Sequence, residues 1–285
     1  MTIKSKIGAH VSIAGGIWNA PQRGSVHGCE VIQIFTRSPQ GGPAPKIDRE
    51  VVDKFKAEMA QNKISEVYIH TPYYINFASE KEQTRETSTR IIREELERGS
   101  MLGSKYIMTH LGSAGTQDRN LAIEEVGKGL AKSLSSYEGS TKLLLEISAG
   151  AGAVIGCTFE EIKTIIDIGD LKSYSGFGGI CFDTCHAFAS GYDFRTKDST
   201  AKTLGEFDKF IGLDLLKLTH VNDSKGAIGD RKDRHEHIGE GMVGIDGMSH
   251  ILSSEPFKKI DWVLETPEEK RPDDIEKLKS IRVGA

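Results

Sequence analysis

At Lys142-Leu-Leu-Leu-Glu-Ile147 the sequence has a short apolar run of strand character that includes one acidic side chain near its end. A charged segment with helical spacing of its apolar residues follows at 158–168. Short strands that alternate with amphipathic helices indicate parallel strands joined by helical crossovers. If the pattern repeats along the chain, it predicts an α/β fold.

The pattern repeats from end to end. Strand-like runs occur at residues 6–11, 31–35, 66–70, 105–110, 142–147, 179–183, 215–221 and 261–266. Helical spacing occurs at residues 48–62, 80–102, 119–137, 158–168, 199–211 and 273–281. Eight strands in a chain of 285 residues favour one closed (β/α)8 TIM barrel over residues 1–285. An open doubly wound sheet is the main alternative.

Composition limits the class of protein. The chain has 37 Lys and Arg against 41 Asp and Glu, a net charge of −4, which argues against a diffuse basic surface for nucleic acid but leaves room for a local basic groove. No stretch resembles a signal peptide or a membrane span, so we expect a cytoplasmic protein without membrane contact. The four cysteines have neither disulfide-scaffold density nor paired C-x2-C spacing, so we expect reduced thiols.

Acidic or imidazole side chains stand at the carboxyl ends of six predicted strands: His70, His110, Glu146, Asp183, His220 and Glu265. Because the carboxyl ends of parallel strands meet at one mouth of a barrel, these six should converge. One such histidine alone is usually a hydrogen-bonded structural residue. Six buried ionisable groups are costly unless they are paired or bind metal, so the set indicates a metal centre.

Three further candidate ligands accompany these six. His186 follows the strand that ends at Asp183, and Asp233-Arg-His235 supplies a carboxylate and an imidazole. The latter pair lies in the longest irregular segment, 222–246, which we expect above the barrel. Nine nitrogen and oxygen donors without thiolate favour Zn²⁺, with Mn²⁺ or iron as alternatives.

Other residues near these candidates have weaker predictions. Cys185 is expected to be a small buried residue rather than a ligand or nucleophile. His10 closes the first strand and could donate a hydrogen bond to a metal ligand. The remaining histidines, His27, His237 and His250, lack matched partners and are expected to be solvated.

The motifs around these residues form a longer pattern. They are Gly8-Ala-His-Val-Ser12 with Gly15-Gly16, His70-Thr-Pro-Tyr-Tyr-Ile-Asn76, His110-Leu-Gly-Ser113, Gly179-Ile-Cys-Phe-Asp-Thr-Cys-His186, His220-Val-Asn-Asp-Ser-Lys225, Asp233-Arg-His235, Ile238-Gly-Glu-Gly241 and Leu264-Glu-Thr-Pro267. Together they resemble the endonuclease IV family over nearly the whole chain. The resemblance implies a TIM barrel with three zinc ions that hydrolyses the phosphodiester 5′ to an abasic site in duplex DNA, during base excision repair.

The resemblance also implies how the nine ligands divide. One zinc ion is expected on His70, His110 and Glu146, a second on Glu146, Asp183, His220 and Glu265, and a third on His186, Asp233 and His235. Glu146 would bridge two ions, and Glu146 and Glu265 are the expected catalytic residues. The cations would activate a water and hold the phosphate, leaving 3′-hydroxyl and 5′-deoxyribose phosphate ends. Trimming of blocked 3′ ends and a monomeric protein are also expected.

Contacts to DNA are expected from loops at the barrel mouth. Tyr73 and Tyr74 are candidates for insertion where the abasic nucleotide is extruded, although paired tyrosines after a strand also pack at a rim. Lys225, Arg231 and Arg234 are candidates for phosphate contacts, although charges in exposed loops are often only solvated.

Two segments depart from the family pattern. Residues 37–42 read Arg-Ser-Pro-Gln-Gly-Gly, where family members often carry an Arg- or Trp-containing loop that enters the DNA. We therefore predict a blunted wedge. Glu146-Ile-Ser-Ala-Gly150 stands where the family commonly has Glu-Asn-Thr-Ala-Gly, which keeps the ligand but changes a nearby polar contact.

Two other functions stay open at this point. A metal-dependent sugar isomerase or epimerase shares the barrel and the metal-binding strand ends, but it needs one or two ions and has a catalytic lysine or a glutamate pair. A catalytically weak DNA-binding or structural metalloprotein would agree with the altered 37–42 loop. Metal stoichiometry separates the first alternative from the nuclease, and binding without incision would support the second.

Overall fold

Parallel strands close into a barrel in the computed structural model, which describes residues 5–284. The barrel strands are β1 (Ile7–His10), β2 (Val31–Ile34), β3 (Val67–His70), β4 (Tyr106–Thr109), β5 (Lys142–Glu146), β6 (Phe177–Asp183), β7 (Leu216–His220) and β10 (Asp261–Leu264). Each strand pairs with its neighbour in sequence, and β10 pairs with both β7 and β1. The predicted TIM barrel is confirmed, and the open doubly wound sheet is wrong because the first and last strands pair.

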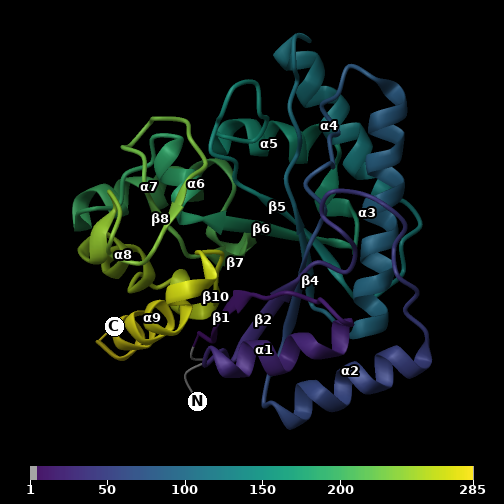
Figure 1. Cartoon of the computed structure of the whole chain (residues 1–285). Coiled ribbons are helices and arrows are strands. Elements are labelled where there is room, and N and C mark those ends of the chain that lie inside the picture. Colours follow the sequence, from purple (N-terminus) through teal and green to yellow (C-terminus); the bar gives the residue numbers. More distant parts are fainter. Residues whose placement is uncertain (1–4, 285) are drawn as a thin grey trace.

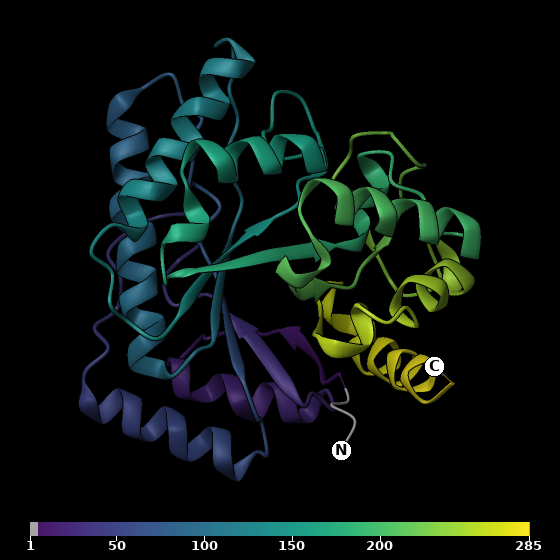
Figure 2. The same cartoon turned by 180° about the vertical axis from the view of Figure 1, so that it is seen from behind.

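Helices surround the barrel (Figure 1). They are α1 (Ala20–Val26), α2 (Arg49–Gln61), α3 (Glu82–Leu102), α4 (Arg119–Leu134), α5 (Phe159–Ile168), α6 (Thr184–Ala189), α7 (Lys197–Phe210), α8 (Gly244–Leu252) and α9 (Arg271–Gly284). Helices α2 to α5 follow one another around one side, and Figure 2 shows the same order from behind. Six of the helices were predicted, whereas α1, α6 and α8 are short and were not. No helix within residues 5–284 is long and apolar enough to cross a membrane.

The barrel interior has an apolar layer below a polar one. The apolar layer is a cluster of buried residues: Val31, Tyr68, Tyr106, Met108, Leu144, Cys181, Leu218 and Val263. Side chains in a strand alternate between the two faces, so the residue two positions later points into the barrel again. That residue is Gln33 after Val31, His70 after Tyr68, Glu146 after Leu144, Asp183 after Cys181, His220 after Leu218 and Glu265 after Val263. The strand pleat therefore directs the candidate ligands into one layer at the barrel mouth.

Strands β1 and β2 approach each other closely where the polar layer begins. A Cβ atom on Gly8 would lie 1.8 Å from the carbonyl oxygen of Val31. Because only glycine tolerates this approach, it places His10 beside Gln33 in the register of the two strands.

The segment 222–246 is more ordered than predicted, because it contains the hairpin strands β8 (Asp223–Ser224) and β9 (His235–Glu236) and the start of α8. The buried Asp223 carboxylate accepts hydrogen bonds from the backbone N–H groups of Gly239 (3.0 Å), Val243 (3.0 Å) and Gly244 (3.2 Å). These bonds fold the segment back on itself and hold it at the barrel mouth.

The prediction that His237 is solvated is wrong. Its side chain is buried, and Nδ1 lies 2.7 Å from Oδ2 of the fully buried Asp274 on α9. His27 also has a partner, Glu268, at 3.4 Å, whereas His250 is half-buried. Asp274 lies in α9, and Glu268 lies just before this helix. Both carboxylates are far from the histidines in sequence, so the residues around each histidine do not indicate its partner. The four cysteines are free thiols, as predicted.

Candidate metal centre

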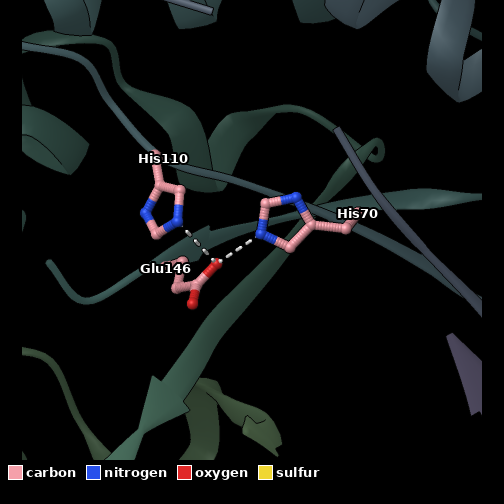
Figure 3. A group of neighbouring side chains, drawn as sticks. All are labelled: His70, His110 and Glu146. Carbon is pink, nitrogen blue, oxygen red and sulfur yellow. Dashed lines mark hydrogen bonds and ion pairs between the residues drawn. The ribbon is translucent and has the colours of Figure 1, made fainter. Parts of the chain in front are cut away.

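Glu146 ends β5 with its side chain fully buried at the barrel mouth. Its Oε2 atom lies 3.1 Å from His70 Nε2 and 3.7 Å from His110 Nε2. Figure 3 shows both imidazoles directing a nitrogen at this one oxygen. The three side chains present donor atoms within 4.8 Å of one another, close enough for them to share a cation.

A second group forms around the other oxygen of the same carboxylate. His220 Nδ1 lies 2.8 Å from Glu146 Oε1, 3.4 Å from Glu265 Oε2 and 3.9 Å from Asp183 Oδ2. The four donor atoms again lie within 4.8 Å of one another. The two groups therefore share Glu146, each through a different oxygen.

The remaining three candidates meet on the side of the mouth covered by segment 222–246. Asp233 lies between the two imidazoles, with Oδ2 3.3 Å from His186 Nε2 and Oδ1 3.4 Å from His235 Nε2. Within residues 5–284, neither of these buried Nε2 atoms has a hydrogen-bond partner. A buried imidazole nitrogen without a partner is unfavourable, so a ligand for both nitrogens would remove this cost.

The turn from β6 into α6 positions two of these side chains. Asp183 precedes the first residue of α6, and its Oδ1 accepts a hydrogen bond from the backbone N–H of His186 (2.8 Å). This is the capping contact expected of an aspartate at a helix start. The other oxygen accepts from Asn222 Nδ2 (2.7 Å). The sequence Asp-Thr-Cys-His thus fixes a carboxylate and an imidazole with one short turn.

Backbone carbonyl groups orient two of the imidazoles. Nδ1 of His70 donates to the carbonyl of Thr71 (2.6 Å), and Nδ1 of His186 donates to the carbonyl of Ile147 (2.9 Å). A proton on Nδ1 leaves the lone pair on Nε2, the atom that faces the carboxylates. Both rings are therefore held in the form that can bind a cation through Nε2.

The charges of the centre are strongly coupled. Burial alone would raise the pKa of Glu146, but His110 and His220 hold it well below its usual range. Burial would also raise the pKa of Glu265, but the charge of His220 lowers it to about 2. Both carboxylates are ionised at neutral pH, and despite burial their charges in turn raise the pKa of His70, His186 and His220. A divalent cation would take the place of protons on these rings.

Cys185 lies beside this centre without acting as a reactive thiol. Its side chain is buried, and burial raises the pKa of the thiol to about 12. Its Sγ lies 3.6 Å from the carbonyl oxygen of Arg234. Although Cys185 is near Asp233 and His235, these properties agree with the structural interpretation.

The two tyrosines after β3 differ in exposure. Tyr73 is 66% exposed, and its ring packs edge-on against His70, with centroids 5.9 Å apart. Tyr74 is half-buried and packs against the hydrophobic core. Both line a cavity of about 360 Å³ that also reaches His110 and His186. Only Tyr73 is both exposed and in contact with a candidate ligand.

Of the three basic candidates, Arg234 lies nearest the centre. It lines a second cavity of about 400 Å³ together with His10, His70 and Glu265. The side chain of Lys225 is half-exposed, 4.0 Å from Glu236, and Arg231 is exposed on the same segment. Neither residue lines the two cavities at the centre.

Arg37 points into the fold rather than toward the mouth. Its side chain is buried, with Nε 2.6 Å from Glu95 Oε1 and Nη2 2.9 Å from Glu94 Oε2. The fully buried Glu95 carboxylate also accepts from Thr36 (2.6 Å). This network attaches the loop after β2 to α3, while residues 38–42 carry neither an aromatic nor a basic side chain. The blunted wedge at this loop stays a prediction.

Gln33 and Arg271 are parts of the centre that the sequence did not reveal. Gln33 Nε2 donates to Glu265 Oε1 (2.6 Å), and Arg271 lines the second cavity while donating to the carbonyl of His10 (2.7 Å). A glutamine within an apolar strand or an arginine at a helix start does not by itself indicate a metal centre. Only the closed barrel shows what they contact. His10 lies at the mouth as expected, but its Nδ1 accepts from Gln33 instead of donating to a candidate ligand.

The fold of this chain is shared with known proteins. A family model described as a xylose isomerase-like TIM barrel matches residues 22–281. A D-tagatose 3-epimerase-like protein has the same fold, with a TM-score of 0.73 over 97% of this chain and 96% of its own, at only 19% identity. These two matches establish the architecture.

Closer similarity is to proteins named for one activity. A probable endonuclease 4 of Halothermothrix orenii is 36% identical over 278 residues, 97% of this chain and 99% of the relative. One of Geotalea daltonii is 39% identical over 268 residues, 93% of this chain and 92% of the relative. The crystal structure of endonuclease IV from Thermus thermophilus superposes with a TM-score of 0.83 over 98% of both chains, at 29% identity. The chain belongs to the endonuclease 4 family, as its motifs predicted.

Proposed function

We propose that this protein is a zinc-dependent AP endonuclease that hydrolyses the phosphodiester 5′ to abasic sites in duplex DNA. Its products are a 3′-hydroxyl and a 5′-deoxyribose phosphate, and the same centre trims blocked 3′ ends. The observation that carries the proposal is the convergence of nine nitrogen and oxygen donors at the barrel mouth, with Glu146 shared by two groups. We further propose that the protein acts as a cytoplasmic monomer in base excision repair, with residues 1–285 forming one catalytic unit.

The donors divide into three proposed zinc sites. The ligand sets are His70, His110 and Glu146; Glu146, Asp183, His220 and Glu265; and His186, Asp233 and His235. The first two sets each hold donor atoms within 4.8 Å of one another. In the third, Asp233 lies 3.3 Å from His186 and 3.4 Å from His235, although Asp183 also has a donor atom within 4.8 Å of both imidazoles. Two features support zinc here: the imidazole-rich donor set, and the buried Nε2 atoms of His186 and His235, which lack a partner within residues 5–284. When bound, zinc ions supply Lewis-acid chemistry that activates water and neutralises phosphate charge.

The chain's own side chains provide orientation and substrate contact. Glu146 and Glu265 provide anionic oxygens to the centre. A hydrogen bond with His220 fixes Glu146, and one from Gln33 fixes Glu265.

Arg234 stands at the cavity rim, where a guanidinium can pair with a DNA phosphate. Tyr73 presents an exposed ring beside His70, where it can occupy the space vacated by an extruded abasic nucleotide. Lys225 and Arg231 contact the backbone farther along the duplex, and Tyr74 supports Tyr73 from the rim.

A sugar isomerase or epimerase agrees less well with this arrangement. One donor group, on Glu146, Asp183, His220 and Glu265, would meet the metal need of such an enzyme, but the structure brings further donors together on His70 and His110. Among the described residues, no lysine lines either cavity at the centre. The additional donor groups and the relatives named as endonucleases therefore favour the nuclease over the isomerase.

The test is incision of a duplex that carries a single tetrahydrofuran abasic analogue. We expect cleavage 5′ to the analogue, loss of cleavage with a chelator and its return with zinc. Glu265→Gln should lower incision by about 100-fold or more, because one anionic donor of a metal group is lost. Glu255→Gln, at an exposed glutamate that pairs with Lys258, is the matched control. Absence of incision by the zinc-loaded protein, or incision that chelators do not affect, would contradict the proposal.

A further inference from the structure

Gln33 is fully buried in the polar layer of the barrel, and its amide contacts three side chains. Nε2 lies 2.6 Å from Glu265 Oε1 and 3.0 Å from His10 Nδ1. Oε1 lies 2.7 Å from His220 Nε2. Both ends of the buried amide are therefore paired, and two of the three partners belong to the same proposed metal group.

The chemistry of the partners fixes which end of the amide faces each one. A carboxylate that binds a cation can only accept hydrogen bonds, so the NH₂ group of Gln33 must face Glu265. The second hydrogen of this group then points to His10, whose Nδ1 accepts it. The carbonyl oxygen is left facing His220, and it can only accept a hydrogen bond from Nε2–H.

His220 is consequently oriented in the opposite sense to His70 and His186. Those two rings donate Nδ1–H to backbone carbonyl groups and present Nε2 to the carboxylates. His220 donates Nε2–H to a side chain and presents Nδ1, which lies 2.8 Å from Glu146. The inversion therefore depends on one glutamine side chain from another strand.

We propose that Gln33 is a positioning residue that selects Nδ1 of His220 as the metal-binding atom and holds Glu265 beside it. The inference rests on the proposed zinc centre and adds to it how one of its groups is assembled. A single amide thus orders two ligands from β7 and the end of β10, while its contact with His10 prevents the amide from rotating. Hydrogen-bond partners of metal ligands typically contribute about 10- to 100-fold to metal affinity.

The experiment measures metal binding rather than DNA cleavage. Gln33→Met keeps a similar length without the hydrogen bonds, and Gln33→Glu keeps the shape but places an oxygen against Glu265. Tyr68→Phe is the matched control, because it removes another buried hydrogen bond inside the barrel, from Tyr68 to Asp261 at 2.7 Å, away from the mouth. Zinc is removed with a chelator and returned in competition with a chromophoric chelator. The thermal melt of each metal-free protein shows that it is folded.

We expect both Gln33 variants to lose about 10- to 100-fold in affinity for one of the bound zinc ions, and Tyr68→Phe to bind as the wild type does. In ¹⁵N-histidine spectra of the zinc-loaded wild type, His220 should carry its proton on Nε2, and His70 and His186 should carry theirs on Nδ1. The His220 signal is identified by its loss in His220→Gln. In Gln33→Met the Nε2–H signal should be lost to exchange with solvent.

The possible failures can be told apart. Unchanged zinc affinity in Gln33→Met, or a proton on Nδ1 of zinc-loaded His220, would overturn the role of Gln33 alone. Wild-type protein that binds zinc without incising abasic DNA would contradict the proposed activity and leave the role of Gln33 standing. Wild-type protein that takes up no zinc would overturn both.

Discussion

Glu146 Oε1 lies 2.8 Å from His220 Nδ1, and both side chains are completely buried. The other oxygen of the carboxylate faces His70 at 3.1 Å, so Glu146 joins two donor groups. Glu146→Gln keeps the shape but removes the charge that both groups share. We expect it to lower incision by more than about 100-fold and to reduce bound zinc per chain. Metal analysis beside the incision assay checks this, with the exposed Glu138→Gln as control. Full zinc content and normal incision would rule out the shared role.

The stability of the metal-free protein should depend on His10 in mildly acidic solution. Burial lowers the pKa of His10 from 6.5 to about 3, despite the nearby Glu265, which raises it. The unfolded chain binds this proton at higher pH than the folded chain. The contribution of His10 to stability is therefore complete above about pH 6.5 and is lost as the pH falls toward about 3.

Urea unfolding of the chelated protein at several pH values measures this effect. Between those limits, the free energy of unfolding of wild type should fall by about 1.4 kcal/mol per pH unit more than that of His10→Gln. Equal slopes for the two proteins would show that His10 is protonated alike in the folded and unfolded states.

Tyr73 should act on DNA binding rather than on folding. Its side chain is 66% exposed, so its removal leaves the core intact. Tyr73→Ala should weaken incision by about 10-fold through KM for the abasic duplex, and Tyr73→Phe should retain most activity. Met101→Ala, at another exposed apolar residue, is the control. Steady-state kinetics check the prediction, and a Tyr73→Ala enzyme with wild-type KM would exclude insertion by this ring.

Arg37 should show the reverse pattern. Its guanidinium pairs with the fully buried Glu95 at 2.6 Å, and Arg37→Met leaves this carboxylate with the more distant Arg98 at 3.6 Å as its only cation among the described residues. The free energy of unfolding should therefore fall by about 3 kcal/mol. At a temperature where the variant is folded, KM for abasic DNA should stay near the wild-type value. Arg49→Met, at an exposed arginine, should change neither quantity. A large increase in KM with unchanged stability would mean that Arg37 reaches DNA after all.

The sequence predicted the barrel and the meeting of the six strand-end donors at its mouth because both follow from local patterns. Strands of period two direct every second residue inward, so an acid or imidazole at a strand end, such as Glu146, must face the mouth. The grouping of the donors, by contrast, came from the family resemblance.

Contacts between distant elements could not be predicted. His237 has no local sign of its partner Asp274, which comes from α9, and Arg37 gives no sign that Glu95 on α3 will bury it. Gln33 lies within an apolar run, where its three partners from other strands become visible only when the barrel closes. The short helix α6 was missed because its cap, Asp183, also ends a strand.

The number of zinc ions needed for incision tests the metal centre most directly. Metal-free protein is titrated with zinc while bound zinc per chain and the rate of incision of the tetrahydrofuran duplex are measured on the same samples. The three proposed zinc sites predict that the rate becomes maximal only as about three ions per chain are bound. A maximal rate with one ion per chain, or in the metal-free protein, would contradict the three-site centre.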